Sequence, residues 1–569
     1  MGNKLELTWL GKENEIKIEP RILVENKELS NTEHDSETEN ILIHGDNLLA
    51  LKALESKYAG QVKCIYIDPP FNTGTRINAD GEEIGYNDNL EHSIWLSLIR
   101  SRLQSLKVLM RDDGVIFVHL DDKEAAYCKV LLDEVFGRKN YINTIVMTTN
   151  DPSGFKSTSN KIFSTANYLF VYAKNSEKLN LKKIYIEKDY DTAYSKIILN
   201  INENYKNWKI QNLRDYVCIK NGFDDYKDAK KSISKELVDI WVKNYALNNP
   251  EQIIRTAAIG GGARKKRNET IEMSKNNRNE VFVHPNEDID NFYIINGEQI
   301  LFYKDRFKLI DGKSRPSQSL TDVWTDISWT GIAKEGNVIF KNSKKPEHLI
   351  SRIINLATED NDYVLDSFLG SATTVAVAHK MNRRWIGIEM ANHAYTHCKV
   401  RLDKVIDGSD QGGISKSVNW NGGGGYKFYE LAPSLINKDD FDEYVINKEY
   451  DADMLASAVA LHEGFNYEPD SEIFWKQSKG NESSYLFVTT RHLNKSYLDS
   501  IKLTMEEGEY LIIACKSFEA ELDKLYPNIT IKKIPQMLLS RCEFGKDNYN
   551  LNIVNPPIYE DEEEENEDE

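Results

Sequence analysis

The chain has 569 residues, of which 40% are hydrophobic and 28% charged, a composition typical of a globular protein with several domains. No stretch reaches the apolar length of a membrane span and the N-terminus lacks a signal-peptide core, so we expect no membrane segment and a cytoplasmic location. The six cysteines form no CxxC pair, which fits reduced thiols and offers no metal site.

The net charge of −18 is unevenly distributed along the chain. The last ten residues, EDEEEENEDE, hold nine acids, and such a block predicts a disordered acidic tail, here over 556–569. In contrast, GGGARKKRNE at 260–269 places basic side chains behind three glycines, namely Arg264, Lys265, Lys266 and Arg267. A flexible basic loop is a usual means of binding phosphates from an acidic protein, although a merely solvated surface loop has the same composition.

In chain order, a polar extension (1–40) precedes a segment in which strands alternate with helices. The apolar spacing predicts strand, turn and helix over 41–54, a strand at 63–68, a helix at 91–110, a strand at 114–120, a helix at 122–137, and strands at 144–149 and 167–174. Such alternation predicts a doubly wound α/β sheet over 41–175.

The alternation stops over 176–325, which is rich in Lys, Asn, Asp and Tyr, so we expect an inserted domain there. It resumes over 326–407, with helices at 346–357 and 374–381 and strands at 362–368 and 383–390. The glycines of 408–425 predict a linker, and the renewed alternation over 426–555 predicts a separate small α/β domain.

Residues 63–76, KCIYIDPPFNTGTR, place a carboxylate, two prolines and an aromatic ring directly after a strand. Asp68 would lie just beyond the carboxyl end of that strand, where such sheets bind ligands. Pro69 and Pro70 stiffen the turn because proline fixes φ and lacks an N–H donor, so Phe71 is held at a loop tip. A plain proline turn with a partly buried ring is the alternative, and the D-P-P-aromatic order favours a ligand site over it.

Residues 364–390, VLDSFLGSATTVAVAHKMNRRWIGIEM, place two acids at the ends of successive strands. Gly370 and Ser371, after Asp366, would let a ligand approach the backbone where a helix begins. Glu389, 23 residues after Asp366, is placed to accept hydrogen bonds from ribose hydroxyls. The turn is not G-x-G-x-x-G and has no P-loop lysine, so a nucleoside without phosphates, such as S-adenosylmethionine, suits it better. Gly and Ser are, however, common in any α/β turn.

Together the two stretches resemble the amino-DNA methyltransferases, with their D-P-P-aromatic loop and F-x-G turn. Here the D-P-P half precedes the F-x-G half with a large insert between them, which resembles the β-class. Further elements recur in register: HGDNLLAL at 44–51, EHSIWLSLIRSRL at 91–103, DGVIFVHLDD at 113–122, KKPEHLISRII at 344–354 and DSFLGSATT at 366–374. The length, the insert and the region 426–555 are most similar to the modification (Mod) subunits of type III restriction–modification systems.

The resemblance implies a Rossmann-like, circularly permuted S-adenosylmethionine-dependent methyltransferase fold whose site residues can be named. The catalytic residues would be Asp68, Pro69, Pro70 and Phe71. The residues at the cofactor would be Asp46, Asp68, Lys345, Pro346, Asp366, Phe368, Gly370, Ser371 and Glu389. Other roles remain open: a strand-end turn also accounts for Asp46, and a helix cap accounts for Lys345 and Pro346. Phe368 fits the core equally well, and we expect His44 and His119 to be structural.

The resemblance also implies a reaction, methyl transfer to the N6 amine of a flipped-out adenine in double-stranded DNA. Asp68 and the Pro69 carbonyl would accept hydrogen bonds from the amine, and Phe71 would stack on the base. An aspartate at position 68 resembles the N6-adenine enzymes, whereas serine is commoner in N4-cytosine enzymes, which remain an alternative. Phe71 stands where Tyr is commoner, and Ala372 stands where Gly is frequent and is harmless only if its φ is negative.

The expected partners follow from the same resemblance. The insert would be the target-recognition domain, with the basic segment on DNA, and the region 426–555 would be an assembly domain for a homodimer that can recruit a restriction (Res) subunit. An adenine methyltransferase without a restriction partner is an alternative. More remote are a methyltransferase for protein or RNA, and an inactive DNA-binding specificity subunit. The target sequence cannot be predicted, because recognition depends on side-chain placement in the insert.

Overall fold

The computed structural model describes residues 6–13, 17–71, 92–149, 162, 164–284, 291–310, 312–340, 344–539, 541, 542 and 544. The chain divides into two compact units, one of 183–321 and the other of the flanking segments 1–182 and 322–569. The predicted acidic tail and most of the predicted loop after Phe71 lie outside the described residues. No helix among the described residues is long and apolar enough to cross a membrane.

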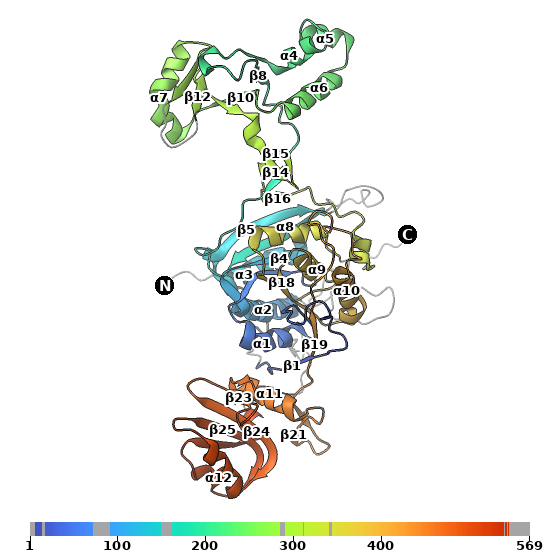
Figure 1. The fold of residues 1–569 in the computed structure, drawn as a ribbon, viewed down its shortest axis with the longest axis vertical. Coiled ribbons are helices and arrows are strands. Elements are labelled where there is room, and N and C mark those ends of the chain that lie inside the picture. The colour runs from blue at the N-terminus through green and yellow to red at the C-terminus, as the bar shows by residue number, and fades with distance from the viewer. Residues whose placement is uncertain are drawn as a thin grey trace. The chain divides into compact units, whose positions relative to one another are not determined.

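A ten-stranded sheet organises the larger unit, in the order β1-β19-β2-β18-β17-β3-β4-β6-β5-β16 (Figure 1). In that order the strands are Leu23–Glu25, Lys427–Leu431, Ile41–His44, Arg384–Glu389, Tyr363–Asp366, Val62–Ile67, Met110–Leu120, Ala166–Ala173, Tyr141–Thr148 and Val323–Trp324. The central strands β2, β18, β17, β3 and β4 are parallel, and β6 runs antiparallel to β4. Strands β3 and β17 pair in the sheet, and β3 comes first in the chain. The half of the domain with the D-P-P-F loop therefore precedes the half with the Asp366 turn, which is the order expected for the circularly permuted fold.

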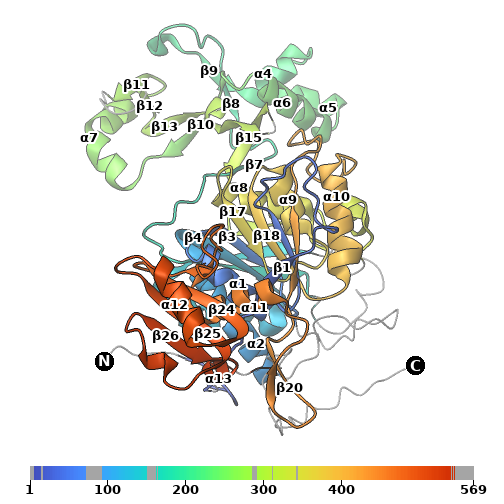
Figure 2. The same cartoon turned by 60° about the horizontal axis from the view of Figure 1, so that its bottom comes forward.

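Two groups of helices cover this sheet (Figures 1 and 2). The first group is α1 (Asn47–Tyr58), α2 (His92–Leu109) and α3 (Asp122–Leu132), and the second is α8 (Glu347–Ala357), α9 (Thr373–Lys380) and α10 (Val400–Ile406). Alternate strand residues such as Ile65 and Ile67 share one buried core with Leu51 and Trp95 of the first group. Because β3 is buried on both faces, its apolar run is nearly continuous. The predicted doubly wound α/β fold is confirmed.

The ends of some elements differ from the predictions. The helix predicted over 91–110 ends at Leu109, because Met110 already belongs to β4. The helix predicted over 122–137 is α-helical to Leu132 and continues as one π-helical turn, Asp133–Gly137. Gly137 has a φ of 89°, which suits glycine at the end of a helix.

The smaller unit contains two sheets, one ordered β11-β12-β13-β10-β8-β9 and one ordered β14-β15-β7. Its strands β7 to β15 are Tyr185–Glu187, Lys196–Ile198, Ile210–Asn212, Ile253–Ala258, Val281–His284, Phe292–Ile295, Glu298–Phe302, Phe307–Ile310 and Lys313–Ser319. Its helices α4 to α7 are Leu213–Lys220, Tyr226–Ser232, Lys235–Asn248 and Gly261–Asn276. The prediction of a flexible basic loop is therefore wrong, because the basic residues lie in the first turns of α7.

Residues 408–425 are packed against the larger unit, so the predicted linker is also wrong. Asp410 and Ser415 are buried, and Trp420 Nε1 donates to the Val405 carbonyl over 2.7 Å. Strand β19 then pairs in parallel with β2 and antiparallel with β1. The main sheet therefore extends past the predicted boundary at 426, and the N-terminal extension supplies its edge strand β1.

A second sheet, ordered β22-β23-β24-β25-β26, follows β19. The remaining strands β20 to β26 are Ile436–Lys438, Tyr444–Ile446, Asn466–Tyr467, Ser478–Lys479, Ser484–Leu493, Tyr510–Phe518 and Ile529–Lys533. The helices α11 to α13 are Ala452–Glu463, Lys495–Thr504 and Gln536–Leu539. Ile22 and Leu435 are buried together with α11 residues such as Val459, so the N-terminal segment contributes to this core as well.

Candidate active site

Four carboxylates lie where neighbouring parallel strands of the main sheet end. Asp366 ends β17, Glu389 ends β18, Asp68 directly follows β3, and Asp46 follows β2 after one glycine. Since these strands are adjacent and parallel, their carboxyl ends meet at one edge of the sheet. The fold therefore brings together the acids of the two motifs, which are about 300 residues apart in the sequence.

Two of these carboxylates shape the turn between β17 and α9. Asp366 accepts hydrogen bonds from the Phe368 amide (2.9 Å) and the Thr374 hydroxyl (2.6 Å). Glu389 accepts from the amides of Gly370 (2.7 Å) and Ala391 (3.0 Å). The backbone of Gly370, at a φ of 56°, faces open space, since a Cβ built there would approach only a Phe340 ring atom at 3.9 Å.

Ala372, at the N-cap of α9, adopts a left-handed conformation with a φ of 60°. The condition under which this alanine would be harmless is not met. A non-glycine residue in this conformation costs about 1–2 kcal/mol because its Cβ crowds the backbone carbonyl. The turn that precedes α9 is thus locally strained, and the packing around it must hold it in place.

Burial disfavours the charged forms of both strand-end acids. It raises the pKa of Asp366 to about 7, and the nearby charges of Asp68 and Glu389 act in the same direction. Burial likewise raises the pKa of Glu389 to about 7, against the effect of the amides of Ala391 and Gly370 that bond to it. Perturbed acids that gather at one edge of a sheet are typical of a functional site.

The loop after β3 is held by contacts from Lys345 and Trp95. The ammonium of Lys345 donates to Asp68 Oδ2 and lies 5.2 Å from the centre of the Phe71 ring. The indole N–H of Trp95 donates to the Pro70 carbonyl over 2.7 Å. Phe71 is therefore half-buried beside a charged pair, and Pro70 is tied to helix α2.

His119 lies behind Phe71, with ring centroids 5.8 Å apart. Its Nδ1 is 2.8 Å from the Tyr66 hydroxyl and its Nε2 is 3.0 Å from the Asn167 amide nitrogen. Burial, and then the charge of Lys345, lowers the pKa of His119 well below its usual value, so the ring is neutral at physiological pH. These contacts agree with the expected structural role. Trp329, 6.1 Å from His119 between ring centroids, is a neighbour that no sequence motif indicates.

Asp46 has two structural partners. Its carboxylate caps α1 by accepting the amides of Leu48 (2.8 Å) and Leu49 (3.1 Å), and it pairs with the buried guanidinium of Arg102 at 3.2 Å. Arg102 also donates to Asn47 over 2.6 Å, and the Asn47 amide donates to the Ser367 carbonyl over 2.8 Å. The bridge from Arg102 through Asn47 ties helices α1 and α2 to the turn after Asp366, and no sequence motif indicates it.

The other expected cofactor residues fall into two groups. Pro346 occupies the N-cap position of α8, and Phe368 belongs to the buried core beside α1 and α2, so each has a structural role. Lys345, Gly370 and Ser371 lie at the carboxyl edge of the sheet. Lys345 bonds to Asp68, the Gly370 amide bonds to Glu389, and Ser371 lies in the turn. Among the described residues, no group of three or more His, Cys, Asp or Glu side chains could hold a metal ion.

A family model for DNA methylases matches residues 62–399 of the chain. The chain is 38% identical over 424 residues to the probable Mod subunit of the type III restriction–modification enzyme HindVI from Haemophilus influenzae, which covers 69% of the chain and 54% of that relative. It is 26% identical over 538 residues to the Mod subunit of EcoP15I from Escherichia coli, with 80% and 77% covered. The chain therefore spans about half the length of the first relative.

Solved structures give a weaker likeness. A DNA modification methylase of Thermus thermophilus, complexed with S-adenosyl-L-methionine, has a TM-score of 0.32 and 12% identity, and the match covers 69% of the chain and 99% of that structure. The M1.HpyAVI–SAM complex has a TM-score of 0.30 and 13% identity, with 64% and 99% covered. The order and direction of the strands in the main sheet identify the fold of this chain.

The raised pKa values of Asp366 and Glu389 predict how stability depends on pH. Both groups bind protons more tightly in the folded than in the unfolded chain, so their contribution is present at acidic pH and is lost as pH rises through about 7. We expect Glu389→Gln to lose less stability than wild type between pH 5 and pH 8, by about 1–3 kcal/mol. Thermal unfolding across this range measures the difference.

Glu55→Gln is a suitable control, because Glu55 lies on α1, partly exposed and paired with Lys52. It should reproduce the wild-type pH dependence. Equal slopes for wild type and Glu389→Gln would contradict the prediction.

Proposed function

Because the chain belongs to the DNA methylase family, we propose that it transfers a methyl group from S-adenosylmethionine to the N6 amine of an adenine in double-stranded DNA. The observation that carries this proposal is the adjacency of β3 and β17, which sets the D-P-P-F loop beside the turn that follows Asp366. One sheet edge then offers hydrogen-bond acceptors for an amine next to a place for a nucleoside.

The residues at the turn fit such a cofactor. The open face of Gly370 admits a ligand close to the backbone, and Glu389 and Asp366 offer acceptors suited to hydroxyl groups and to positive charge. When bound, S-adenosylmethionine supplies the electrophilic methyl group. We propose that Gly370, Ser371 and Glu389 hold it, with Lys345 at the boundary towards Asp68.

The reaction needs an exocyclic amine whose lone pair is made available for attack. Asp68 would accept a hydrogen bond from this amine and orient it, which is catalysis by position and electrostatics. In this structure the ammonium of Lys345 donates a hydrogen bond to Asp68. The amine of the target base would donate to the same carboxylate. The base must leave the duplex, at a cost of a few kcal/mol, and stacking on Phe71 would return about 1–3 kcal/mol.

We propose adenine and not cytosine as the target base, because position 68 is an aspartate. The relatives are Mod subunits of type III enzymes, which supports the same choice. We propose that the chain is the modification and specificity subunit of a type III restriction–modification system and acts in the cytoplasm. The unit 183–321 would recognise the target sequence. An adenine methyltransferase without a restriction partner is the second candidate, and the same site would serve it.

Asp68→Ala tests the proposed chemistry. The variant should bind S-adenosylmethionine with nearly wild-type affinity, because the turn after Asp366 holds the cofactor, but methylation of DNA should fall by about 1,000-fold or more, since the amine loses its acceptor. Calorimetry and transfer of a labelled methyl group measure the two properties. Asp112→Ala removes an exposed carboxylate and is the matched control. Substantial methylation by Asp68→Ala would contradict the proposal.

The amino-terminal part of α7, with its basic side chains, is the proposed DNA contact within 183–321. Arg264, Lys265 and Lys266 are exposed, whereas Arg267 is buried with its guanidinium 4.1 Å from the centre of the Phe292 ring. Changing the three exposed residues to Ala should weaken DNA binding at any sequence and lower the salt slope by about one for each phosphate that is no longer neutralised. Arg267→Ala should instead lower stability, because Arg267 is buried against Phe292, and we do not expect Arg267 to bind DNA.

Titrations of DNA at several salt concentrations measure both slope and affinity. The double change Lys230→Ala and Lys231→Ala removes exposed charges from α5 of the same unit and serves as the control. An unchanged slope in the triple variant, or an equal loss in the control, would argue against α7.

We further propose a homodimer that recruits a Res subunit, with the region after β19 as an assembly surface. This region has a core of its own around Trp475 and shares a second core with Ile22. It also exposes large apolar side chains, among them Phe441 and Leu503, each 87% exposed. A chain that ends at Ser434 keeps β19 in the main sheet and removes this region. It should be monomeric in light scattering, where the full chain is dimeric, and it should still bind cofactor. A monomeric full chain at micromolar concentration, with and without DNA, would contradict the dimer.

A further inference from the structure

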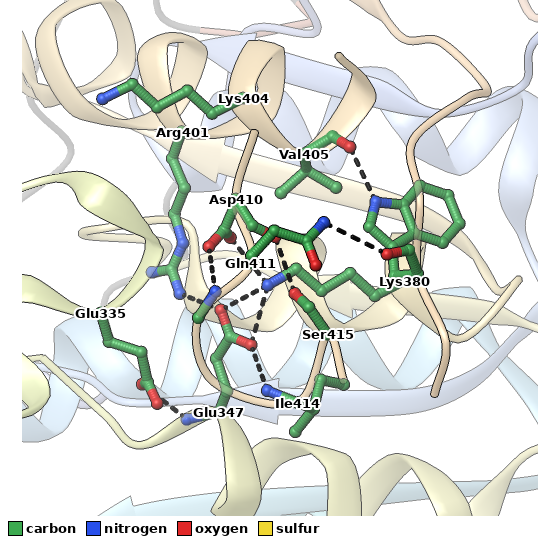
Figure 3. Close-up of polar contacts among 12 residues, drawn as sticks. Glu335, Glu347, Lys380, Arg401, Lys404, Val405, Asp410, Gln411, Ile414 and Ser415 are labelled. Atoms are coloured by element: carbon green, nitrogen blue, oxygen red, sulfur yellow. Dashed lines mark hydrogen bonds and ion pairs between the residues drawn. The ribbon is translucent and has the colours of Figure 1, made fainter. Parts of the chain in front are cut away.

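Four charged side chains form a buried cluster behind the cofactor turn (Figure 3). They are Glu347, Lys380, Arg401 and Asp410, and all four side chains are fully buried. Lys380 Nζ lies 2.9 Å from a Glu347 oxygen and 2.7 Å from an Asp410 oxygen, and Arg401 Nη2 donates to Glu347 over 2.7 Å. The two cations balance the two carboxylates, so the cluster carries no net charge.

The other guanidinium nitrogen of Arg401 reaches the cofactor turn itself. Nη1 donates to the Ser371 carbonyl over 3.0 Å and to the Thr373 hydroxyl over 2.8 Å. Arg401 thus bonds on one side to the charge cluster and on the other to the segment around the strained Ala372. Cys398 adds a contact from the same side, from its Sγ to the Gly370 carbonyl at 3.2 Å.

Two glycines allow the backbone to close on the cluster. A Cβ at Gly336 would lie 2.4 Å from Arg401 Nε, and one at Gly413 would lie 2.1 Å from Glu347 Oε2. The Ile414 amide donates to Glu347 over 3.1 Å, and the Glu347 amide donates to Glu335 over 2.9 Å. The segment 408–415 therefore forms one wall of the cluster.

Glu347 also connects the cluster to the catalytic loop. It is the first residue of α8, two residues after Lys345, whose ammonium bonds to Asp68. Burial alone would raise the pKa of Glu347, but the charges of Arg401 and Lys380 outweigh it and keep that pKa below its usual value. An ionised Glu347 thus anchors both the start of α8 and the arginine behind the turn.

A purely stabilising role does not account for this arrangement. Replacing a buried ion pair by apolar side chains is often neutral or favourable, because desolvation offsets the attraction. What such a cluster provides is fixed geometry, and here Arg401 transmits that geometry to the turn through its bonds to Ser371 and Thr373. We infer that Arg401, held by the three other members of the cluster, is a positioning residue that sets the turn for S-adenosylmethionine. This inference rests on the proposed function.

Arg401→Lys tests the inference on the full chain. A lysine keeps the positive charge of the cluster but cannot bond to Glu347, Ser371 and Thr373 together. We expect the dissociation constant for S-adenosylmethionine, measured by calorimetry without DNA, to rise on the order of tenfold or more. KM for the cofactor should rise by a similar factor, with a smaller change in kcat.

Arg383→Lys is the matched control, because Arg383 is also buried and bonds to Thr358 and Asp360 near the amino ends of the strands. It should lower the unfolding temperature without changing cofactor affinity. A second pair keeps the test decisive if Arg401→Lys does not fold. Thr373→Val removes the hydroxyl that accepts from Arg401 and that also lies 3.2 Å from the Ser371 hydroxyl, and it should weaken binding, whereas Thr373→Ser keeps the hydroxyl and should bind like wild type.

Wild-type affinity in folded Arg401→Lys, or an equal loss in Arg383→Lys, would overturn the inference. So would equal affinities of Thr373→Val and Thr373→Ser. A wild-type chain that binds S-adenosylmethionine but does not methylate DNA would refute the proposed function and leave the positioning role standing. A wild-type chain that does not bind the cofactor would overturn both.

Discussion

The parallel pairing of β2, β18, β17 and β3 is the constraint on which the site depends. Parallel strands bring their carboxyl ends to one edge, so an acid after each strand becomes a neighbour of the others. Burial raises the pKa of Asp366, and the proximity adds to this effect, because the charges of Asp68 and Glu389 act in the same direction. The parallel sheet therefore brings the acids of the site together and also places their negative charges close to one another.

Basic side chains from outside these four strands neutralise two of the four acids. Arg102 of α2 pairs with Asp46, and Lys345, just before α8, pairs with Asp68. Asp366 is stabilised instead by a hydroxyl and an amide. The acids at the two ends of the row are therefore neutralised by the protein, while those of β17 and β18 rely on neutral donors.

Local patterns predicted the strands and the motif positions because each depends on a few adjacent residues. The alternation of strands and helices around β3, the D-P-P-F loop and the Asp366 turn are patterns of this kind. Contacts such as Trp329 with His119, or Arg401 with Thr373, join residues whose spacing carries no pattern, so they could not be predicted. The linker predicted from the glycines of 408–425 is wrong for another reason. Gly413 allows the backbone to approach Glu347 closely, and composition alone does not distinguish a glycine of this kind from one in a flexible linker.

The acids that end β17 and β18 suit the proposed cofactor for a physical reason. With pKa values near 7, Asp366 and Glu389 are only partly ionised at neutral pH, and a positive charge beside them would favour their ionised forms. A cationic ligand would therefore bind with release of protons and more tightly as pH rises, whereas an anionic phosphate would meet repulsion. Asp366 and Glu389 therefore suit the proposed sulfonium nucleoside better than they would suit a nucleotide.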